Sequence, residues 1–295
     1  MMCPYDWQSE MSGAGDTLTA LWVGDATHIV TVGTNGTILR SSGDGSWDYD
    51  AAPLGLGVGR ATLHDVWGSG PGDLYAVGQG GAIIHSTGDG KWSAQVSGTK
   101  VALYAVSGTS PTDVYAAGQA GTLLHSVGDG VWTTIPLPTA EALLHLEHDG
   151  SRGILVASAL TLFRSTGGAW VAEPFEQGLE LHALHPSASG DLYATAANSD
   201  GNASYVLRAI GSGGWERMLT VPAGHGTVES IGGNASDLYA AGARGVLARG
   251  PVDGKGQWSE QRSSITSVFY AVGSSEPSAV FAVGEDGLIL RRRFR

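Results

Sequence analysis

The sequence of 295 residues predicts an all-β fold, a seven-bladed β-propeller with four antiparallel strands in each blade. Three observations lead to this prediction. Each repeat contains four short apolar runs separated by Gly, Asp, Ser and Pro. The last repeat lacks one run, which the N-terminus supplies. A Gly-x-Trp phrase also recurs with a period of roughly 40 residues, ending at Trp47, Trp92, Trp132, Trp170, Trp215 and Trp258.

The second repeat shows the four runs in order as TLHDVWG, LYAVG, AIIHS and WSAQV. Runs of this length, rich in Val, Ile, Leu, Tyr and Trp, are typical of β-strands. We find no longer segment with the period of a helix. The phrase VGQGGAI predicts a two-residue hairpin turn in which glycine takes a positive φ. The Asp-Gly pair of STGDGKW predicts the next turn, and the tryptophan opens the outermost strand.

Closure of the ring depends on the two ends of the chain. After Trp258 we expect three strands, around 266–272, 279–284 and 287–293, and no Trp strand follows them. The segment 4–10 contains Trp7 and is expected to complete that last blade. The chain 1–295 is therefore predicted to be one propeller domain, with blades at 17–52, 60–98, 101–137, 141–175, 179–221, 226–262 and 265–294 plus 4–10.

We call a set of equivalent positions in the aligned repeats a column, and we expect two further columns to have structural roles. An aliphatic or aromatic residue begins each innermost strand, at Leu18, Leu63, Leu103, Leu143, Leu181, Val228 and Phe269. An aspartate recurs at one turn, where we expect its carboxylate to accept backbone N–H groups. These aspartates are Asp73, Asp113, Asp191 and Asp237.

Composition and charge restrict the partners. The net charge is −12, and three lysines are present, so a nucleic-acid partner is not expected. No run approaches 18 consecutive apolar residues, so no membrane span is predicted. The start MMCPYDWQSE has no pattern of a secretory signal. We expect a soluble protein, and its compartment stays open between the cytoplasm and an exported form whose signal has been removed.

The candidate site comes from the column in which the repeats differ. The residue after each innermost aliphatic is Thr19, His64, Tyr104, Leu144, His182, Glu229 or Tyr270. The next column adds Asp65 and His145, and Glu147 and His185 follow further along. Inner strands of a propeller begin around the mouth of its central channel. We therefore predict that these polar side chains converge there.

Three interpretations of this set remain open. Imidazole and phenol groups can move a proton, so His64 or His182 could serve as base and Tyr104 or Tyr270 as acid, with Glu229 beside them. Alternatively, three histidines and a carboxylate suit zinc or iron, and this donor set is His64, His145, His182 and Glu229. In the third interpretation these groups fill a wet channel and hydrogen-bond to one another.

Besides Trp7, two tryptophans lie outside the Gly-x-Trp series. Trp22 and Trp67 fall on the inner strands of adjacent blades. We expect them either to pack in the core or to stack in one sector of the channel. Stacked indoles would offer a platform for the apolar face of a sugar ring.

The repeat resembles bacterial propeller repeats of the form L-x-x-V-W-G-S-x-P-x-D-L-Y-A-V-G, which stands here at 63–78. More loosely, it is similar to tectonin and Asp-box (BNR-like) propellers. The tryptophan follows Asp89 more closely than in the Asp-box, and no GH and WD pairing of WD repeats is present. Such families include lectins, assembly factors and sugar-cleaving enzymes.

The resemblance therefore implies a propeller more strongly than it implies an activity. We predict a binding module for a carbohydrate or a protein surface at the channel mouth. Asp65, His145, His185, Trp22 and Trp67 are its expected contacts. The alternative is a lyase or cyclase that uses the His/Tyr/Glu set. The cofactor stays unknown, with a divalent metal as one option.

Overall fold

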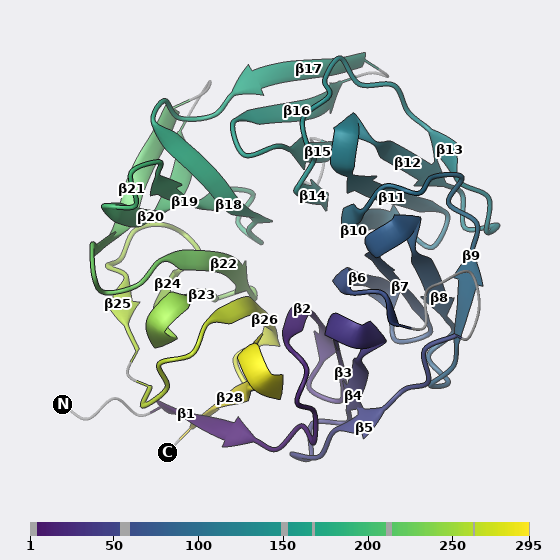
Figure 1. Ribbon diagram of the computed structural model, residues 1–295. Coiled ribbons are helices and arrows are strands. Elements are labelled where there is room, and N and C mark those ends of the chain that lie inside the picture. Colours follow the sequence, from purple (N-terminus) through teal and green to yellow (C-terminus); the bar gives the residue numbers. More distant parts are fainter. Residues whose placement is uncertain are drawn as a thin grey trace.

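The computed structural model describes residues 5–53, 60–148, 153–166, 169–210, 214–261 and 263–294. Within these ranges, 28 strands form seven four-stranded sheets. The sheets stand as blades around a common axis, and the first strand of each lies innermost (Figure 1). The predicted all-β, seven-bladed propeller is confirmed.

The chain passes through the blades in order. Blades 1 to 3 contain β2 (Leu18–Asp25), β3 (His28–Gly33), β4 (Ile38–Ser41) and β5 (Asp48–Tyr49); β6 (Leu63–Gly70), β7 (Asp73–Gly78), β8 (Ile83–Ser86) and β9 (Trp92–Gln95); β10 (Leu103–Ser110), β11 (Asp113–Gly118), β12 (Leu123–Ser126) and β13 (Thr133–Thr134). Blades 4 and 5 contain β14 (His145–His148), β15 (Ile154–Ala157), β16 (Thr161–Thr166) and β17 (Ala169–Pro174); β18 (Leu179–Pro186), β19 (Leu192–Asn198), β20 (Ala203–Ile210) and β21 (Gly214–Pro222). Blades 6 and 7 contain β22 (Val228–Gly233), β23 (Asp237–Gly242), β24 (Leu247–Pro251) and β25 (Ser259–Glu260); β26 (Phe269–Glu276), β27 (Ala279–Gly284), β28 (Ile289–Phe294) and β1 (Tyr5–Glu10).

Blade 7 is built from both ends of the chain. Strand β1 lies beside β28 (Figure 1) and pairs with it antiparallel, so that Trp7 is opposite Arg292. The indole of Trp7 meets the Tyr239 ring of blade 6 edge to face, with ring centroids 6.4 Å apart. The prediction that the N-terminal strand closes the last blade is confirmed.

The links between second and third strands differ from the predicted hairpins. In blade 2, a 3₁₀ turn, η3 (Gln79–Gly81), joins β7 to β8. Gly80 and Gly81 take φ values of 68° and 76°, as predicted for glycine in this phrase, but the two-residue turn is wrong. A Cβ at Gly81 would lie 2.3 Å from the Thr99 carbonyl oxygen, so the approach of the next connection requires glycine.

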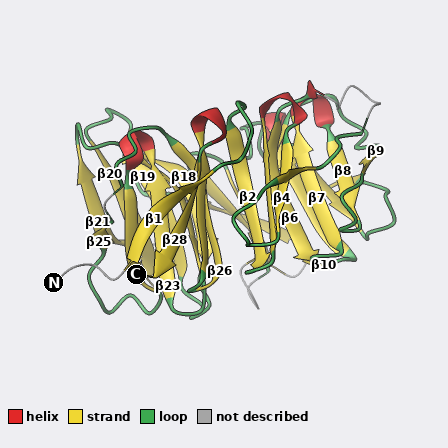
Figure 2. Ribbon diagram, turned by 90° about the horizontal axis from the view of Figure 1, so that it is seen from below, coloured by secondary structure: helices red, strands yellow, loops and turns green. Residues whose placement is uncertain are grey.

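Matching 3₁₀ turns define one face of the propeller. They lie together along one edge of the molecule, which we call the helical face (Figure 2). The opposite face carries the turns between first and second strands and those between third and fourth strands. The turns that match η3 are η1 (Thr34–Gly36), η4 (Gln119–Gly121), η6 (Ala243–Gly245) and η7 (Glu285–Gly287).

The core lies between neighbouring blades, and the recurring tryptophan explains why. Trp132 of blade 3 meets Tyr75 of blade 2 edge to face, with centroids 6.1 Å apart. Trp47 of blade 1 meets Phe281 of blade 7 in the same way at 6.0 Å. Burying such rings between sheets is the main source of cohesion in this arrangement. The repeated Gly-x-Trp phrase therefore anchors each blade to the one before it.

Candidate binding site at the axis

The variable column of the repeat coincides with a β-bulge in six blades. In blade 2, Leu63 pairs with Gly78 and Asp65 with Val77, so His64 has no partner on β7. A bulge redirects the side chain of the extra residue. The same register shift occurs at the other positions. We call the six bulge residues the axial ring: Thr19, His64, Tyr104, His182, Glu229 and Tyr270.

The axial ring lies toward the helical face, because the inner strands of blades 1, 2, 3, 6 and 7 begin beside the glycine that precedes a 3₁₀ turn. In blade 4 the regular strand β14 begins only after Leu144. That blade therefore has no bulge residue in the ring.

A charged pair joins blades 5 and 6 in this ring. The Nδ1 atom of His182 lies 3.2 Å from Oε2 of Glu229 and 3.2 Å from the Val228 carbonyl oxygen. The hydrogen bond with Glu229 raises the pKa of His182, and the same bond lowers the pKa of Glu229. The other carboxylate oxygen accepts the Thr227 hydroxyl. These contacts favour an imidazolium beside a carboxylate.

An aromatic pair joins blades 2 and 3. The rings of His64 and Tyr104 have centroids 5.2 Å apart and are tilted by 58°. Burial lowers the pKa of His64, which favours the neutral imidazole at neutral pH. This half of the ring is therefore aromatic and uncharged at its histidine.

Tyr270 of blade 7 extends the charged side of the ring. Its side chain is 41% exposed. Burial, with the charges of Glu285 and Glu229, raises the pKa of Tyr270. A phenol with a raised pKa keeps its proton at neutral pH and remains a hydrogen-bond donor.

Asp65 has a structural contact that the sequence did not indicate. Its two carboxylate oxygens accept the backbone N–H groups of Val66 and, in blade 3, Val106, each at 2.8 Å. Ser230 holds the same place in blade 6 and accepts the N–H of Val272 at 3.1 Å. This column thus ties adjacent inner strands together. Burial raises the pKa of Asp65 to about 7.

The remaining predicted residues lie on the inner strands of blades 4 and 5, farther from the helical face than the axial ring. Burial, and to a smaller extent the charge of His182, lowers the pKa of His145 to about 4. Burial also lowers the pKa of His185 to about 4. Burial, with the charge of Asp65 second, raises the pKa of Glu147 to about 8. Each of these shifts favours the uncharged form at neutral pH, so these three groups add polarity but little charge to the inner strands.

The structure does not assemble the predicted metal ligands. In the described ranges, no three His, Cys, Asp or Glu side chains are placed to hold one ion. His182 directs Nδ1 to Glu229, whereas His64 packs on Tyr104 of another sector. The set His64, His145, His182 and Glu229 is therefore not a single donor set.

The two tryptophans of the inner strands are also separated. Trp22 donates its indole N–H to the Gly68 carbonyl at 3.1 Å, in the interface of blades 1 and 2. Trp67 lies over Gly108, where an added Cβ would be 2.8 Å from its ring, in the interface of blades 2 and 3. Side chains of this column face the next blade, and the glycine opposite leaves room for the indole. The predicted stacking of Trp22 with Trp67 is therefore wrong.

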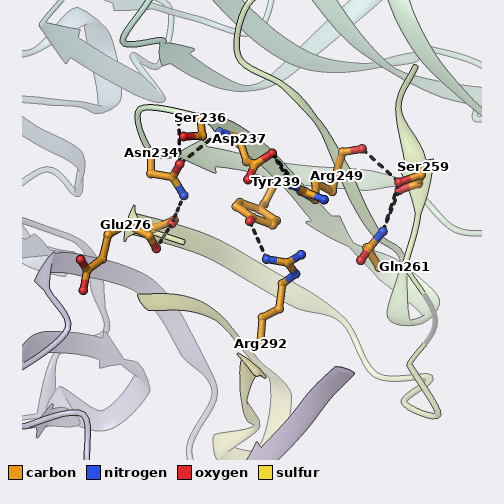
Figure 3. Close-up of polar contacts among 10 residues, drawn as sticks. Asn234, Ser236, Asp237, Tyr239, Arg249, Ser259, Gln261, Glu276 and Arg292 are labelled. Atoms are coloured by element: carbon orange, nitrogen blue, oxygen red, sulfur yellow. Dashed lines mark hydrogen bonds and ion pairs between the residues drawn. The ribbon is translucent and has the colours of Figure 1, made fainter. Parts of the chain in front are cut away.

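The repeated aspartates bind side chains, contrary to the expectation of turn caps. Asp73 and His85 are 2.8 Å apart, as are Asp113 and His125. In blade 6, Arg249 donates two hydrogen bonds of 2.9 Å to Asp237 (Figure 3). The basic partner follows 12 residues later in these three blades, on the adjacent strand. That fixed spacing is the signal by which the sequence could have revealed the pairs.

Comparison with known proteins supports the fold and no closer relationship. No protein-family model and no curated protein matches the chain. The solved structure titled "YCF48 bound to D1 peptide" is 16% identical, with a TM-score of 0.77 and coverage of 98% of this chain and 94% of that one. A streptogramin B lyase structure is 12% identical, with a TM-score of 0.79 and coverage of 99% and 98%. The WD40 propeller domain of Doa1 is 14% identical, with a TM-score of 0.73 and coverage of 98% and 97%.

At these identities the similarity establishes the propeller alone. The resemblance to tectonin and Asp-box repeats stays a prediction. In the part of the chain that the structure describes, no helix has the length and apolar character needed to cross a membrane.

Proposed function

We propose that this protein is a binding module that recognises a polypeptide segment at the axial ring. The observation that carries the proposal is the meeting of two different pairs at one end of the axis, His64 with Tyr104 and His182 with Glu229. Their strands β6 and β10 stand across the ring from β18 and β22 (Figure 1). A ligand over the axis would meet an aromatic side and a charged side.

The chemistry of both pairs suits a peptide. An imidazolium donates to a backbone carbonyl, a carboxylate accepts from an amide or a basic side chain, and aromatic rings pack on apolar side chains. A net charge of −12 favours a segment that carries Lys or Arg. The structure of YCF48 with a peptide supports the proposal by analogy of fold.

A peptide-array screen tests the proposal. We expect binders enriched in basic residues, with affinity at least ~10-fold weaker for Glu229→Gln and for Tyr104→Ala, equal to about 1.4 kcal/mol. Asp73→Asn alters a carboxylate on the opposite face and is the matched control. Binders that treat Glu229→Gln like the wild type would contradict the proposal. A glycan array is run in parallel. If glycans bind the wild type and the axial-ring variants Glu229→Gln and Tyr104→Ala weaken that binding, the ligand is a carbohydrate and not a polypeptide.

A second candidate, β-elimination on an acidic polysaccharide, is favoured by one observation. His182 of blade 5 and Tyr270 of blade 7 flank Glu229 of blade 6, and they would act as base and acid. The reaction would use the neutral form of His182, which prevails only above its raised pKa. That imidazole would remove the proton next to the uronate carboxyl, and the phenol would protonate the departing oxygen. We expect turnover of a uronate polymer that His182→Ala abolishes. Absence of unsaturated product at any pH from 5 to 9 would exclude this candidate.

A further inference from the structure

A cavity of about 320 Å³ lies between blades 1 and 2, away from the axial ring. It opens at the opposite face, because Thr27, Pro71 and Gly88 of its wall belong to turns on that face. Trp22, Val30 and Leu74 contribute apolar surface, and Arg40 contributes a cation. Its volume is within the range of small-molecule sites.

The cavity arises where blade 1 departs from the repeat. Val30 pairs with Arg40, as Tyr75 pairs with His85 and Phe281 with Arg291. An aromatic ring therefore occupies this position in five blades, at Tyr75, Tyr115, Tyr193, Tyr239 and Phe281. In blade 4 the position is Leu155, which packs in an apolar cluster with Phe175 and Trp215. In blade 1 the smaller valine borders the open volume instead.

The polar end of blade 1 departs from the repeat as well. His28 holds the place of Asp73 and contacts Asp25 at 2.9 Å. Arg40 therefore lacks an aspartate partner at the position that Asp73 occupies in blade 2. Its guanidinium reaches the Gly88 carbonyl at 3.3 Å and the buried Asp50 carboxylate at 3.4 Å.

Arg40 stays 38% exposed at the cavity wall. In blade 7, the equivalent Arg291 lies over the Phe281 ring, 5.2 Å from its centroid. Arg40 is placed to cover a ring in the same manner. Trp22 offers a second wall, and its indole N–H is held by Gly68.

We propose that this cavity binds an aromatic ring supplied from outside the chain, a phenyl or phenol group that takes the place of the ring missing at Val30. The ring would pack on Trp22 and Leu74 and under the guanidinium of Arg40. Hydroxyl groups of Ser41 and Ser86 at the wall suit the phenolic OH. The ring can come from a tyrosine side chain of a partner or from a free small phenol.

The test titrates two probes, p-cresol and N-acetyl-tyrosinamide, into the wild-type protein and into Val30→Tyr. We expect p-cresol to bind the wild type with a Kd on the order of 1 mM. Val30→Tyr supplies the ring from within, so affinity should fall at least ~10-fold and the melting temperature should rise. Val171→Tyr, on an outer strand where Val171 is 46% exposed, is the control and should bind as the wild type does.

The two probes distinguish the source of the ring. Binding of both supports a tyrosine side chain, and binding of p-cresol alone supports a free phenol. Tyr75→Val should open a second cavity and raise the stoichiometry from one ring to two. If Val30→Tyr fails to fold, Trp22→Ala tests the same wall and should weaken p-cresol binding. Failure of both probes to bind the wild type, or unchanged binding in Val30→Tyr, would overturn the proposal whatever happens at the axial ring.

Discussion

The indole nitrogen of Trp92 donates a hydrogen bond of 3.2 Å to the Asp50 carboxylate of the preceding blade. The same bond joins Trp47 to Glu10 at 3.0 Å. Trp132 makes it to the Gln95 side chain at 2.8 Å. Each acceptor stands three residues after the tryptophan of its own blade. These three bonds therefore link blades 7, 1, 2 and 3 in succession, and the N-terminal strand takes part through Glu10.

This relationship predicts the effect of removing one acceptor. Asp50→Ala leaves the Trp92 N–H without its partner and Arg40 without its carboxylate. We expect a loss of about 1–3 kcal/mol in the free energy of unfolding. Asp50→Asn keeps a carbonyl acceptor and should lose less. Chemical denaturation measures both, with Asp48→Ala, two residues earlier on β5, as control. Equal stability of Asp50→Ala and Asp48→Ala would contradict the prediction.

The same relationship predicts a stabilising substitution. The indole nitrogen of Trp258 is buried and has no hydrogen-bond partner among the described residues. By sequence spacing its acceptor position is Met218, three residues after Trp215, where β21 bulges. Met218 packs on the apolar cluster that contains Trp258. Met218→Gln should supply the acceptor and raise the free energy of unfolding by about 1 kcal/mol. Met218→Leu is the control. A Gln variant no more stable than the Leu variant would argue against the rule.

The His182 and Glu229 pair predicts a range of pH in which it stabilises the fold most. The raised pKa of His182 stabilises the fold below the ordinary value of 6.5, and this effect is lost as pH rises through the folded value. The lowered pKa of Glu229 stabilises the fold above 4.5, and this effect is lost as pH falls through its folded value. The pair should therefore stabilise most between about pH 4.5 and 6.5.

Melting temperatures of the wild type and Glu229→Gln measure this contribution. Their difference should be largest inside this range and smaller at pH 3 and pH 9. Thr227→Val removes only the hydroxyl contact to Glu229, so it is the control and should leave the pH at the maximum unchanged. A difference that does not vary with pH would show that no charged pair forms.

Repetition made most of the fold predictable. The period of Trp47, Trp92 and Trp132 gave the blade count, and Trp7 gave the closure, because each blade needs one such ring between it and its neighbour. The positions of the axial ring also followed from the repeat. Their bulges did not follow, because a bulge depends on which residues of two strands pair, and a single strand's pattern leaves that register open.

The contacts between columns could not be predicted by taking each column alone. Asp73 and His85 were both visible in the sequence, yet their pairing depends on the register of β7 with β8. The separation of Trp22 from Trp67 depends on Gly68 and Gly108, whose importance lies in the indoles packed against them. The cavity beside Val30 exists because valine is smaller than the aromatic residue at the equivalent position of five other blades. The unfilled volume is recognised only when the blades are compared in three dimensions.

Glu147 gives the last prediction, with the opposite sign from Glu229. Burial raises the pKa of Glu147 from 4.5 to about 8, so the folded protein retains a proton that the unfolded chain releases. Stability is therefore lost as pH rises from 4.5 through the folded value. Glu147→Gln has no such proton, so its stability relative to the wild type should increase between pH 5 and pH 8.5. Glu141→Gln, at an exposed site, is the control. Parallel curves for the wild type and Glu147→Gln would show that the carboxylate ionises freely beside Asp65.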